Sequence, residues 1–353
     1  MTAAGGVFVI AEAGSNWRVG TDDTDRQMAQ ALVRVAVDAG ADAVKFQTFR
    51  AGEVYVADAG QSEYLSELGI KRSINDIFED LEMPYDLVGE IAGYCGEQGI
   101  EFMSTPFSVV DADAVDPHVR RHKVASYEIN LVRLLQRLAA ARKPLLISTG
   151  AATVDDIEFS LKTVRDAGAE DITLLQCTSS YPAPPESLNL TAIPWMRERF
   201  GLPVGLSDHS RDPLVGPVSA VALGATVIEK HFTIDNRLPG PDHAYALEPE
   251  ELTAMVQAVR AAEQVRGDGV KAVGSHEMEL RRFAVRAIQA TRDIEPGDAI
   301  VEGDNVDVLR PGKRSSGMHP RHLDTLQGRH ATRHIPAGEG IRPGDVLPPI
   351  ADA

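Results

Sequence analysis

Two histidines stand at equivalent places in the sequence, each at the end of a strand-like run. His209 lies in the segment GLSDHS and His231 in the segment IEKHF. If the two runs are neighbouring strands of one sheet, their imidazoles can bind one divalent ion, and two nitrogen ligands leave positions open for water or a substrate oxygen. Each histidine could instead be a hydrogen-bonded residue at the rim of the fold. The metal site is therefore a hypothesis that depends on the two strands being adjacent.

A second group of side chains suits an anionic ligand. Hydroxyl and ammonium groups directed at one point can satisfy the oxygens of a phosphate or a carboxylate. One serine after a strand carries little weight, because serine favours turns, but here serine or lysine recurs at successive strand ends. The residues are Lys45, Lys123, Ser126, Ser148, Ser179 and Ser207. A lysine within a strand must face a site or the interior, where an unpaired charge is costly. A Schiff-base role for Lys45 or Lys123 is the rival interpretation.

Three acidic residues occupy similar places. Glu12 and Glu128 follow the first and fourth strand-like runs, and Asp242 lies in the loop after the eighth. Such carboxyl groups could serve as general acid or base, or could orient sugar hydroxyls. A salt bridge to a neighbouring lysine is the structural alternative for each of them.

These side chains can meet only if the strand-like runs share one sheet. Eight short runs of apolar and β-branched residues recur, at 7–11, 43–46, 100–103, 123–126, 145–148, 172–177, 204–206 and 226–228. Helical spacing of apolar residues predicts helices over 25–39 and 155–167, each ended by a glycine. The alternation favours a parallel (β/α)8 barrel, whose site lies at the carboxyl ends of the strands. An open doubly wound sheet, with its site at one switch point, is the alternative.

Two stretches fall outside the strand–helix alternation. Residues 53–83 are predicted to form an elaborated loop with short helices over the barrel mouth. After a barrel domain at 1–266 and a linker at 267–283, residues 284–353 carry repeated Pro-Gly turns, which predict a small, mostly β domain. The fragments DIEPGDAI and HIPAGEGI within it are alike.

Composition excludes several classes of protein. The chain has 353 residues, with 35 Lys and Arg against 52 Asp and Glu, so its net charge is −17. An acidic surface argues against binding to nucleic acid or anionic membrane. Two cysteines, Cys95 and Cys177, exclude a disulfide scaffold, and both are predicted to be buried without a nucleophilic role. No run approaches the roughly 20 apolar residues of a membrane span, and no signal peptide is evident, so a cytoplasmic protein is expected.

The chain resembles the N-acetylneuraminate (sialic acid) synthase family, which includes the legionaminic and pseudaminic acid synthases. The resemblance rests on segments that follow in order over about two thirds of the chain: IAEAGSN, GADAVKFQTF, FMSTPFS, HKVASYEI, LLISTG, CTSSYPAP, GLSDHS, IEKHFT and GPDHAYALEPEEL. The tail, with ATRDIEPGDAI and VLRPG, resembles the antifreeze-protein-like (SAF) domain that ends these enzymes.

The resemblance implies a reaction and a set of roles. Phosphoenolpyruvate would condense with the open-chain aldehyde of an N-acyl mannosamine-type sugar, giving a nine-carbon 2-keto-3-deoxy (nonulosonic) acid and phosphate. His209 and His231 would carry a divalent metal, usually Mn²⁺, with Mg²⁺ or Co²⁺ possible. Lys45, Lys123 and the four serines would bind phosphoenolpyruvate. Catalytic residues would be Glu12, Glu128, Tyr181 and Asp242, and acceptor contacts Gln47, Thr105 and Arg310, with Arg314 as the alternative to Arg310.

The resemblance also implies a domain-swapped homodimer, in which the tail of one subunit covers the barrel of the other. Three stretches depart from the family's pattern: Asn16-Trp17-Arg18, Ser179, and the tail segment RPGKRSSGMHP. All three are expected where the acceptor sugar lies, although Trp17 could equally pack on neighbouring helices. A lysine Schiff-base aldolase and an inactive sugar-binding relative remain the alternative functions.

Overall fold

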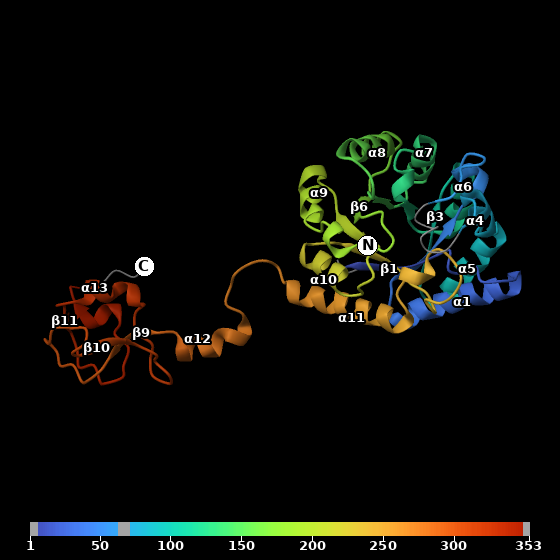
Figure 1. The fold of residues 1–353 in the computed structure, drawn as a ribbon. Helices are drawn as coiled ribbons and strands as arrows, with labels where there is room; N and C mark the ends of the chain where they lie inside the picture. Colours follow the sequence, from blue (N-terminus) through green and yellow to red (C-terminus); the bar gives the residue numbers. More distant parts are fainter. Residues whose placement is uncertain (1–5, 63–70, 349–353) are drawn as a thin grey trace. The chain divides into compact units, whose positions relative to one another are not determined.

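The computed structural model describes residues 6–62 and 71–348 and divides the chain into two compact units, Met1–Asp268 and Gly269–Ala353. Each unit is described by itself. Figure 1 shows the first as strands ringed by helices and the second as a small unit with short strands. No helix of the described residues is long and apolar enough to cross a membrane.

The first unit is a (β/α)8 barrel. Its strands are β1 (Phe8–Gly14), β2 (Ala43–Thr48), β3 (Glu101–Pro106), β4 (His122–Val124), β5 (Leu145–Ser148), β6 (Ile172–Cys177), β7 (Val204–Asp208) and β8 (Val227–His231). All paired neighbours are parallel, in the order β3-β2-β1-β8-β7-β6-β5-β4. The first strand pairs with the last, and β3 contacts β4, so the sheet closes on itself. The predicted barrel is confirmed, and the open doubly wound sheet is wrong.

Helices cover the outside of this sheet. They are α1 (Asp22–Ala39), α5 (Tyr85–Gln98), α6 (Val109–Val115), α7 (Val132–Ala140), α8 (Val154–Asp166), α9 (Ala192–Phe200), α10 (Val215–Ala222) and α11 (Pro249–Arg266). The first predicted helix ends as expected at Gly40, whose φ of 80° is the left-handed conformation that favours glycine. Buried residues of α1, such as Leu32 and Val33, pack towards the strands.

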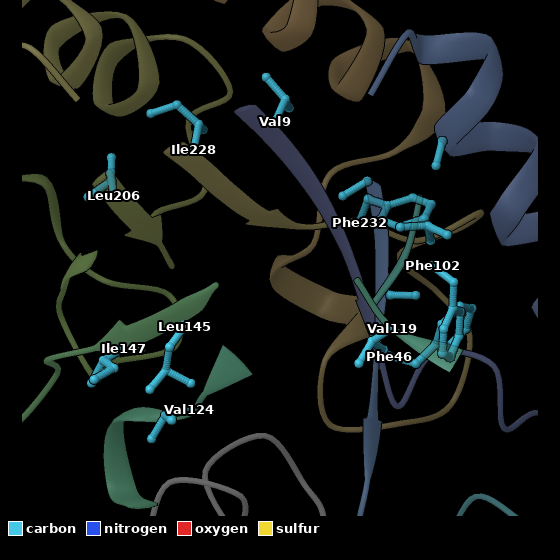
Figure 2. Close-up of a cluster of buried hydrophobic side chains, with 14 of the residues drawn as sticks. Val9, Phe46, Phe102, Val119, Val124, Leu145, Ile147, Leu206, Ile228 and Phe232 are labelled. Carbon is cyan, nitrogen blue, oxygen red and sulfur yellow. The ribbon is translucent and has the colours of Figure 1, made fainter. Parts of the chain in front are cut away.

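Strand alternation creates two apolar layers. On β1, Val9 and Ala11 belong to the large cluster between strands and helices, part of which Figure 2 shows. Phe8 and Ile10 point the other way, into a smaller cluster that fills the barrel interior together with Ala43, Met103, Leu146, Leu175 and Val227. Because successive side chains alternate, the next inward residues towards the carboxyl ends are polar. The barrel is thus packed at one end and polar at the other.

The insertion after β2 forms its own small core. It contains α2 (Ala51–Val54) and α4 (Ile74–Asp80), and Phe49, Ile74, Ile77 and Leu81 pack together. The expected short helices are therefore present in the described part. The predicted range includes residues 63–70, which lie outside the described residues.

The second unit is mostly short β elements around a separate core. Its elements are α12 (Met278–Ala284), β9 (Ala287–Ala290), β10 (Val306–Leu309), α13 (Leu323–Leu326), β11 (His330–Ala331) and β12 (Val346–Leu347). Pairs β9–β10 and β11–β12 are antiparallel. Ile294 and Ile335, from the two similar fragments, pair with each other across an antiparallel bridge. The predicted small β domain is confirmed.

Candidate active site

A cavity of about 740 Å³ opens at the carboxyl ends of the barrel strands. Its size suits a small-molecule site. Every predicted site residue of the barrel lines it: Glu12, Lys45, Gln47, Thr105, Lys123, Ser126, Glu128, Ser148, Ser179, Tyr181, Ser207, His209, His231 and Asp242. Tyr55, Ile74 and Phe78 of the insertion also line it, so the insertion lies at the barrel mouth as predicted.

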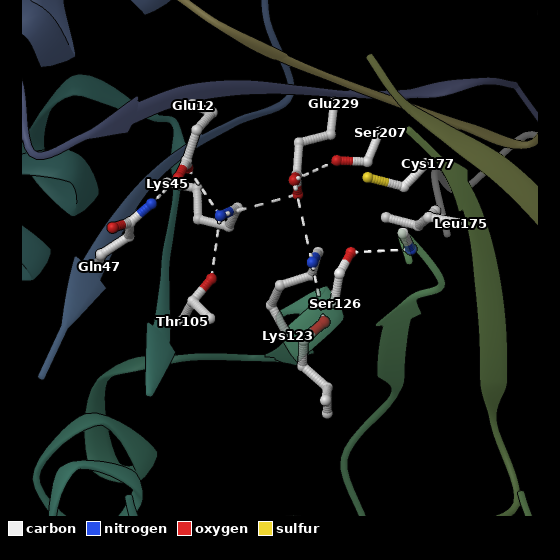
Figure 3. Close-up of polar contacts among 12 residues, drawn as sticks. Glu12, Lys45, Gln47, Thr105, Lys123, Ser126, Leu175, Cys177, Ser207 and Glu229 are labelled. Carbon is white, nitrogen blue, oxygen red and sulfur yellow. Dashed lines mark hydrogen bonds and ion pairs between the residues drawn. The ribbon is translucent and has the colours of Figure 1, made fainter. Parts of the chain in front are cut away.

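Two buried lysines share a carboxylate at the base of this cavity (Figure 3). Lys45 Nζ lies 2.7 Å from Glu12 Oε2 and 3.8 Å from Glu229 Oε2. Lys123 Nζ lies 3.9 Å from Glu229 Oε1 and donates to the Val124 carbonyl at 2.9 Å. Lys45 also donates to Thr105 Oγ1 at 2.9 Å. Thr105, predicted to contact the acceptor, is therefore a partner of Lys45.

Glu229 is the residue that the sequence analysis missed. It also accepts a hydrogen bond from Ser207 Oγ at 3.0 Å, so it joins β7 and β8 to both lysines. The signal was available, because Glu229 lies two residues after the inward-facing Val227 and two before His231. Residues at this spacing on a strand share one face.

Burial and charge separate the acidic groups by protonation state. Burial would raise the pKa of Glu229, but the ammonium groups of Lys123 and Lys45 lower it to about 2. Burial raises the pKa of Glu12 to about 7, against the opposing effect of Lys45. Burial likewise raises the pKa of Glu128 to about 7. Near neutral pH Glu229 is therefore firmly ionised, whereas Glu12 and Glu128 can give or take a proton.

The serine hydroxyls surround one glycine. The prediction that Ser126 lies on the fourth strand is wrong. That strand, β4, ends at Val124, and Ser126 lies in the 3-10 turn that follows it (Ser126–Glu128). Its Oγ accepts a hydrogen bond from the Gly150 amide at 3.0 Å. The Oγ atoms of Ser148 and Ser179 are buried and have no hydrogen-bond partner within residues 6–62 and 71–348. They can therefore bind the oxygens of an anionic ligand.

Gly150 allows this crowding. A Cβ atom at this position would lie 2.8 Å from Ser126 Oγ and 2.9 Å from Cys177 Sγ, and it would also collide with Ser179 Oγ. Any side chain at residue 150 would thus displace the hydroxyls. The chain needs glycine here for space.

The two imidazoles lie together, as the sequence predicts. The ring centroids of His209 and His231 are 5.3 Å apart, and both side chains are buried. His209 Nδ1 lies 2.9 Å from the carbonyl of Thr178, which must accept, so His209 keeps its Nε2 lone pair. His231 Nδ1 is buried without a hydrogen-bond partner in the described part of the chain, and burial keeps the pKa of this ring well below its usual value. Burial lowers the pKa of His209, but the neighbouring Cys177 and the Thr178 carbonyl raise it above its usual value overall. When both rings are deprotonated, their uncommitted nitrogens fit a divalent ion.

The protein offers this ion two side chains and not a full set. Across residues 6–62 and 71–348, no group of three or more His, Cys, Asp and Glu side chains is placed to hold a metal. Water or substrate oxygens would have to complete the coordination, as at a catalytic metal site.

Aromatic rings and Asp242 form the remaining wall. The ring of Tyr181 lies over His209 with centroids 4.3 Å apart, and the ring of Tyr245 lies 5.3 Å from that of His231. Tyr245 donates to Asp242 Oδ1 at 2.9 Å, and Ser15 Oγ lies 3.1 Å from the other oxygen. Asp242 is thereby held at the cavity edge.

Several predicted features lie elsewhere. Trp17 is 2% exposed and packs in the cluster between strands and helices, so the alternative that it packs on helices is confirmed and the expectation that it faces the acceptor is wrong. Cys95 and Cys177 are buried, as predicted. Cys177 Sγ lies 3.8 Å from His209 Nδ1, a contact that the sequence analysis did not foresee. Arg310 and Arg314 belong to the second unit, where Arg310 follows β10 and is exposed.

Comparison with known proteins gives consistent results along the whole chain. The NeuB family model matches residues 32–271, and the SAF domain model matches residues 285–347. The spore coat polysaccharide biosynthesis protein SpsE of Bacillus subtilis is 40% identical over 97% of this chain and 94% of its own. Its crystal structure covers 98% of this chain and 96% of its own, with a TM-score of 0.63.

Two further relatives are named as synthases. The N,N'-diacetyllegionaminic acid synthase of Legionella pneumophila is 38% identical over 94% of this chain and 92% of its own. A pseudaminic acid synthase of Campylobacter jejuni is 35% identical over 96% of each chain.

Proposed function

The chain belongs to the NeuB family, and from this membership and the cavity we propose that it condenses phosphoenolpyruvate with the open-chain aldehyde of an N-acyl mannosamine-type sugar. The products are a nine-carbon 2-keto-3-deoxy acid and inorganic phosphate. The chain is thus a synthase, a transferase that forms a carbon–carbon bond. The observation that carries the proposal is the convergence of two buried lysines, unpartnered hydroxyls and two imidazoles on one cavity.

Phosphoenolpyruvate binds at the base of the cavity in this proposal. Lys123 and Lys45 supply positive charge, and Ser126, Ser148, Ser179 and Ser207 surround the same space. Ammonium and hydroxyl groups together satisfy phosphate and carboxylate oxygens. Burial strengthens these interactions, since water screens them little there.

His209 and His231 would hold the metal. A bound divalent ion, for which we propose Mn²⁺, supplies a Lewis acid for the aldehyde oxygen of the acceptor. The protein holds the two rings beside the phosphoenolpyruvate end of the cavity. Tyr181, which stacks on His209, and Asp242, which is fixed by Tyr245 and Ser15, shape the space for the acceptor. Gln47, which donates to Glu12 Oε1 at 3.2 Å, lines the same space.

Protons are managed by the carboxyl groups with raised pKa values. The methylene carbon of phosphoenolpyruvate, C3, attacks the aldehyde carbon, and the new alkoxide takes a proton. Water then adds to C2, the carbon that bears the phosphate, and loses a proton. The tetrahedral intermediate expels phosphate as the ketone forms at C2, and the remaining hydroxyl proton leaves with the phosphate. Glu12 and Glu128, with pKa values of about 7, can give the first proton and take the second.

The proposal extends to a domain-swapped homodimer, on the family resemblance. Arg310 of one subunit would then contact the N-acyl group of the acceptor in the barrel of the other. Mixing inactive His209→Ala protein with inactive Arg310→Ala protein tests this, because a mixed dimer contains one intact site. Recovery of activity on mixing supports the swap, and no recovery despite subunit exchange contradicts it.

A phosphate-release assay tests the reaction. The protein is incubated with Mn²⁺, phosphoenolpyruvate and a panel of acetamido and diacetamido hexoses, and mass spectrometry identifies the product. At least one acceptor should release phosphate, and His209→Ala and His231→Ala should abolish release while the fold stays intact. Lys123→Met should weaken phosphoenolpyruvate binding, whereas Lys162→Met, which changes a 75%-exposed lysine, should not. Binding of phosphoenolpyruvate without release from any acceptor would favour a sugar-binding protein.

A Schiff-base aldolase is the second candidate, because burial lowers the pKa of Lys123 and an aldolase lysine must be deprotonated to react. Borohydride reduction in the presence of pyruvate separates the two. Covalent labelling of Lys123 would identify the aldolase, and no labelling is expected for the synthase.

A further inference from the structure

A buried lysine lies on the outer side of the barrel wall, directly behind the two imidazoles. On β8, Glu229 and His231 face the cavity, while Lys230 between them does not line it. The side chain of Lys230 is 2% exposed, although lysine is almost never fully buried without partners. Such a placement calls for an explanation.

The partners of Lys230 all flank His209. Its Nζ donates to Asp208 Oδ2 at 2.7 Å, to the Ser210 carbonyl at 2.6 Å and to Ser210 Oγ at 3.2 Å. Asp208 Oδ1 accepts from the Ser210 amide at 2.8 Å, which closes the group. The ammonium group of Lys230 therefore holds Asp208 and Ser210, the residues on either side of His209. Lys230 itself directly precedes His231.

This contact begins where the backbone pairing ends. The register of β7 and β8 runs through Leu206–Ile228 and Ser207–Glu229 and stops at Asp208–Lys230. Both histidines follow that last pair, so β-sheet hydrogen bonds between these two strands no longer fix their separation. The Lys230 side chain continues the connection by one residue.

We propose that Lys230, with Asp208 and Ser210, fixes the spacing of His209 and His231 and is a positioning residue for a divalent cation. The inference rests on the proposed function, because it assumes that both imidazoles bind one ion. Thr178 orients the ring of His209 through Nδ1, and Lys230 places the backbone that carries this ring beside β8. Groups behind metal ligands commonly change metal affinity by about 10–100-fold when they are removed.

Gly216 provides an independent way to disturb this group. It lies in α10, and a Cβ atom there would be 2.7 Å from Asp208 Oδ2. Gly216→Ala therefore pushes the carboxylate away from Lys230 while it removes no polar group and adds nothing to the cavity. Alanine is also the better helix former, so this variant is expected to fold.

The experiment measures Mn²⁺ binding directly, by electron paramagnetic resonance of the free ion, alongside thermal unfolding. Wild-type protein should bind one Mn²⁺ per chain, and His231→Ala should not. Lys230→Met and Gly216→Ala should each weaken binding at least tenfold. The matched control is Arg121→Met. It breaks a partly buried ion pair between Arg121 and Glu101, 2.7 Å apart, and neither residue lines the cavity. It should lower the unfolding temperature without changing Mn²⁺ affinity.

The results separate the two claims. If wild-type protein binds Mn²⁺ through the histidines and folded Lys230→Met binds it equally well, the positioning role is overturned and the proposed function stands. If Lys230→Met does not fold, unchanged affinity in Gly216→Ala overturns the role. If neither wild-type nor His231→Ala protein binds Mn²⁺, the metal site of the proposed function fails, and the positioning role fails with it.

Discussion

Glu229→Gln removes the carboxylate that two buried lysines share. Its oxygens lie 3.8 Å from Lys45 Nζ and 3.9 Å from Lys123 Nζ. Lys45 keeps Glu12 at 2.7 Å, whereas Lys123 is left with the carbonyl of Val124. Breaking a buried ion pair from one side costs about 3–5 kcal/mol, because the other charge stays buried without its partner. We expect the free energy of unfolding to fall by about this amount at pH 7.

The same substitution should increase the stabilisation of the folded protein by an anionic ligand. With Glu229 neutral, the phosphate and carboxylate of phosphoenolpyruvate meet two ammonium groups and less opposing charge. A ligand that binds only the folded state stabilises it in proportion to the logarithm of its concentration over its dissociation constant. At one fixed phosphoenolpyruvate concentration, the ligand-induced gain in stability should therefore be larger in Glu229→Gln than in the wild type, although turnover should fall.

Urea unfolding with and without phosphoenolpyruvate measures both effects. Glu12→Gln is the matched control: its carboxyl has a pKa of about 7 and contacts Lys45 alone of the two lysines, so its removal should cost less at pH 7. The reasoning is refuted if Glu229→Gln is as stable as the wild type, or if phosphoenolpyruvate stabilises the variant less than the parent.

Three further predictions concern other parts of the barrel. Glu128→Gln should be more stable than the wild type above pH 7, by up to about 3 kcal/mol. The buried carboxyl has its pKa raised from 4.5 to about 7, so the wild-type protein loses stability as the pH rises through that interval and the variant does not. Urea unfolding should show the gain in stability at pH 8 and little at pH 5. Gly150→Ala should raise the KM for phosphoenolpyruvate at least tenfold by displacing Ser126 and Ser179, with kcat less affected; steady-state kinetics measure the split. Trp17→Ala should cost about 3–5 kcal/mol of stability and leave the order of preference among acceptor sugars unchanged, which denaturation and the acceptor panel together check.

Much of the site was predictable because a parallel barrel places the carboxyl end of every strand at one mouth. His209 follows β7 and His231 ends β8, and this alone sufficed to bring the two rings together. Ser126 was assigned to the wrong element without harm, since a turn directly after β4 reaches the same mouth. Strand order therefore mattered more than exact strand bounds.

The sequence failed where side-chain direction decided the role. Glu229 was missed because the eighth strand was ended at Ile228, although alternation from Val227 would have placed residues 229 and 231 on the inner face. For Trp17 the sequence left two places open, the cavity and the neighbouring helices, and the structure buries it in the core. Thr105 lies at the mouth as expected, and its hydroxyl accepts from Lys45, a contact that the sequence analysis did not foresee. Such choices depend on packing, which the one-dimensional pattern does not contain.

A chain with a net charge of −17 can still host an anionic substrate, because charge at the surface and charge in the cavity act over different ranges. Salt screens exposed charges beyond about 8 Å, whereas buried groups a few ångströms from the ligand are screened much less. Burial also neutralises part of the local acidity, since Glu12 and Glu128 have pKa values of about 7 and are about half protonated near neutrality. Glu229 remains firmly ionised against Lys45 and Lys123. The cavity is therefore less negative than its composition suggests, and an incoming phosphate competes with Glu229 for the two ammonium groups.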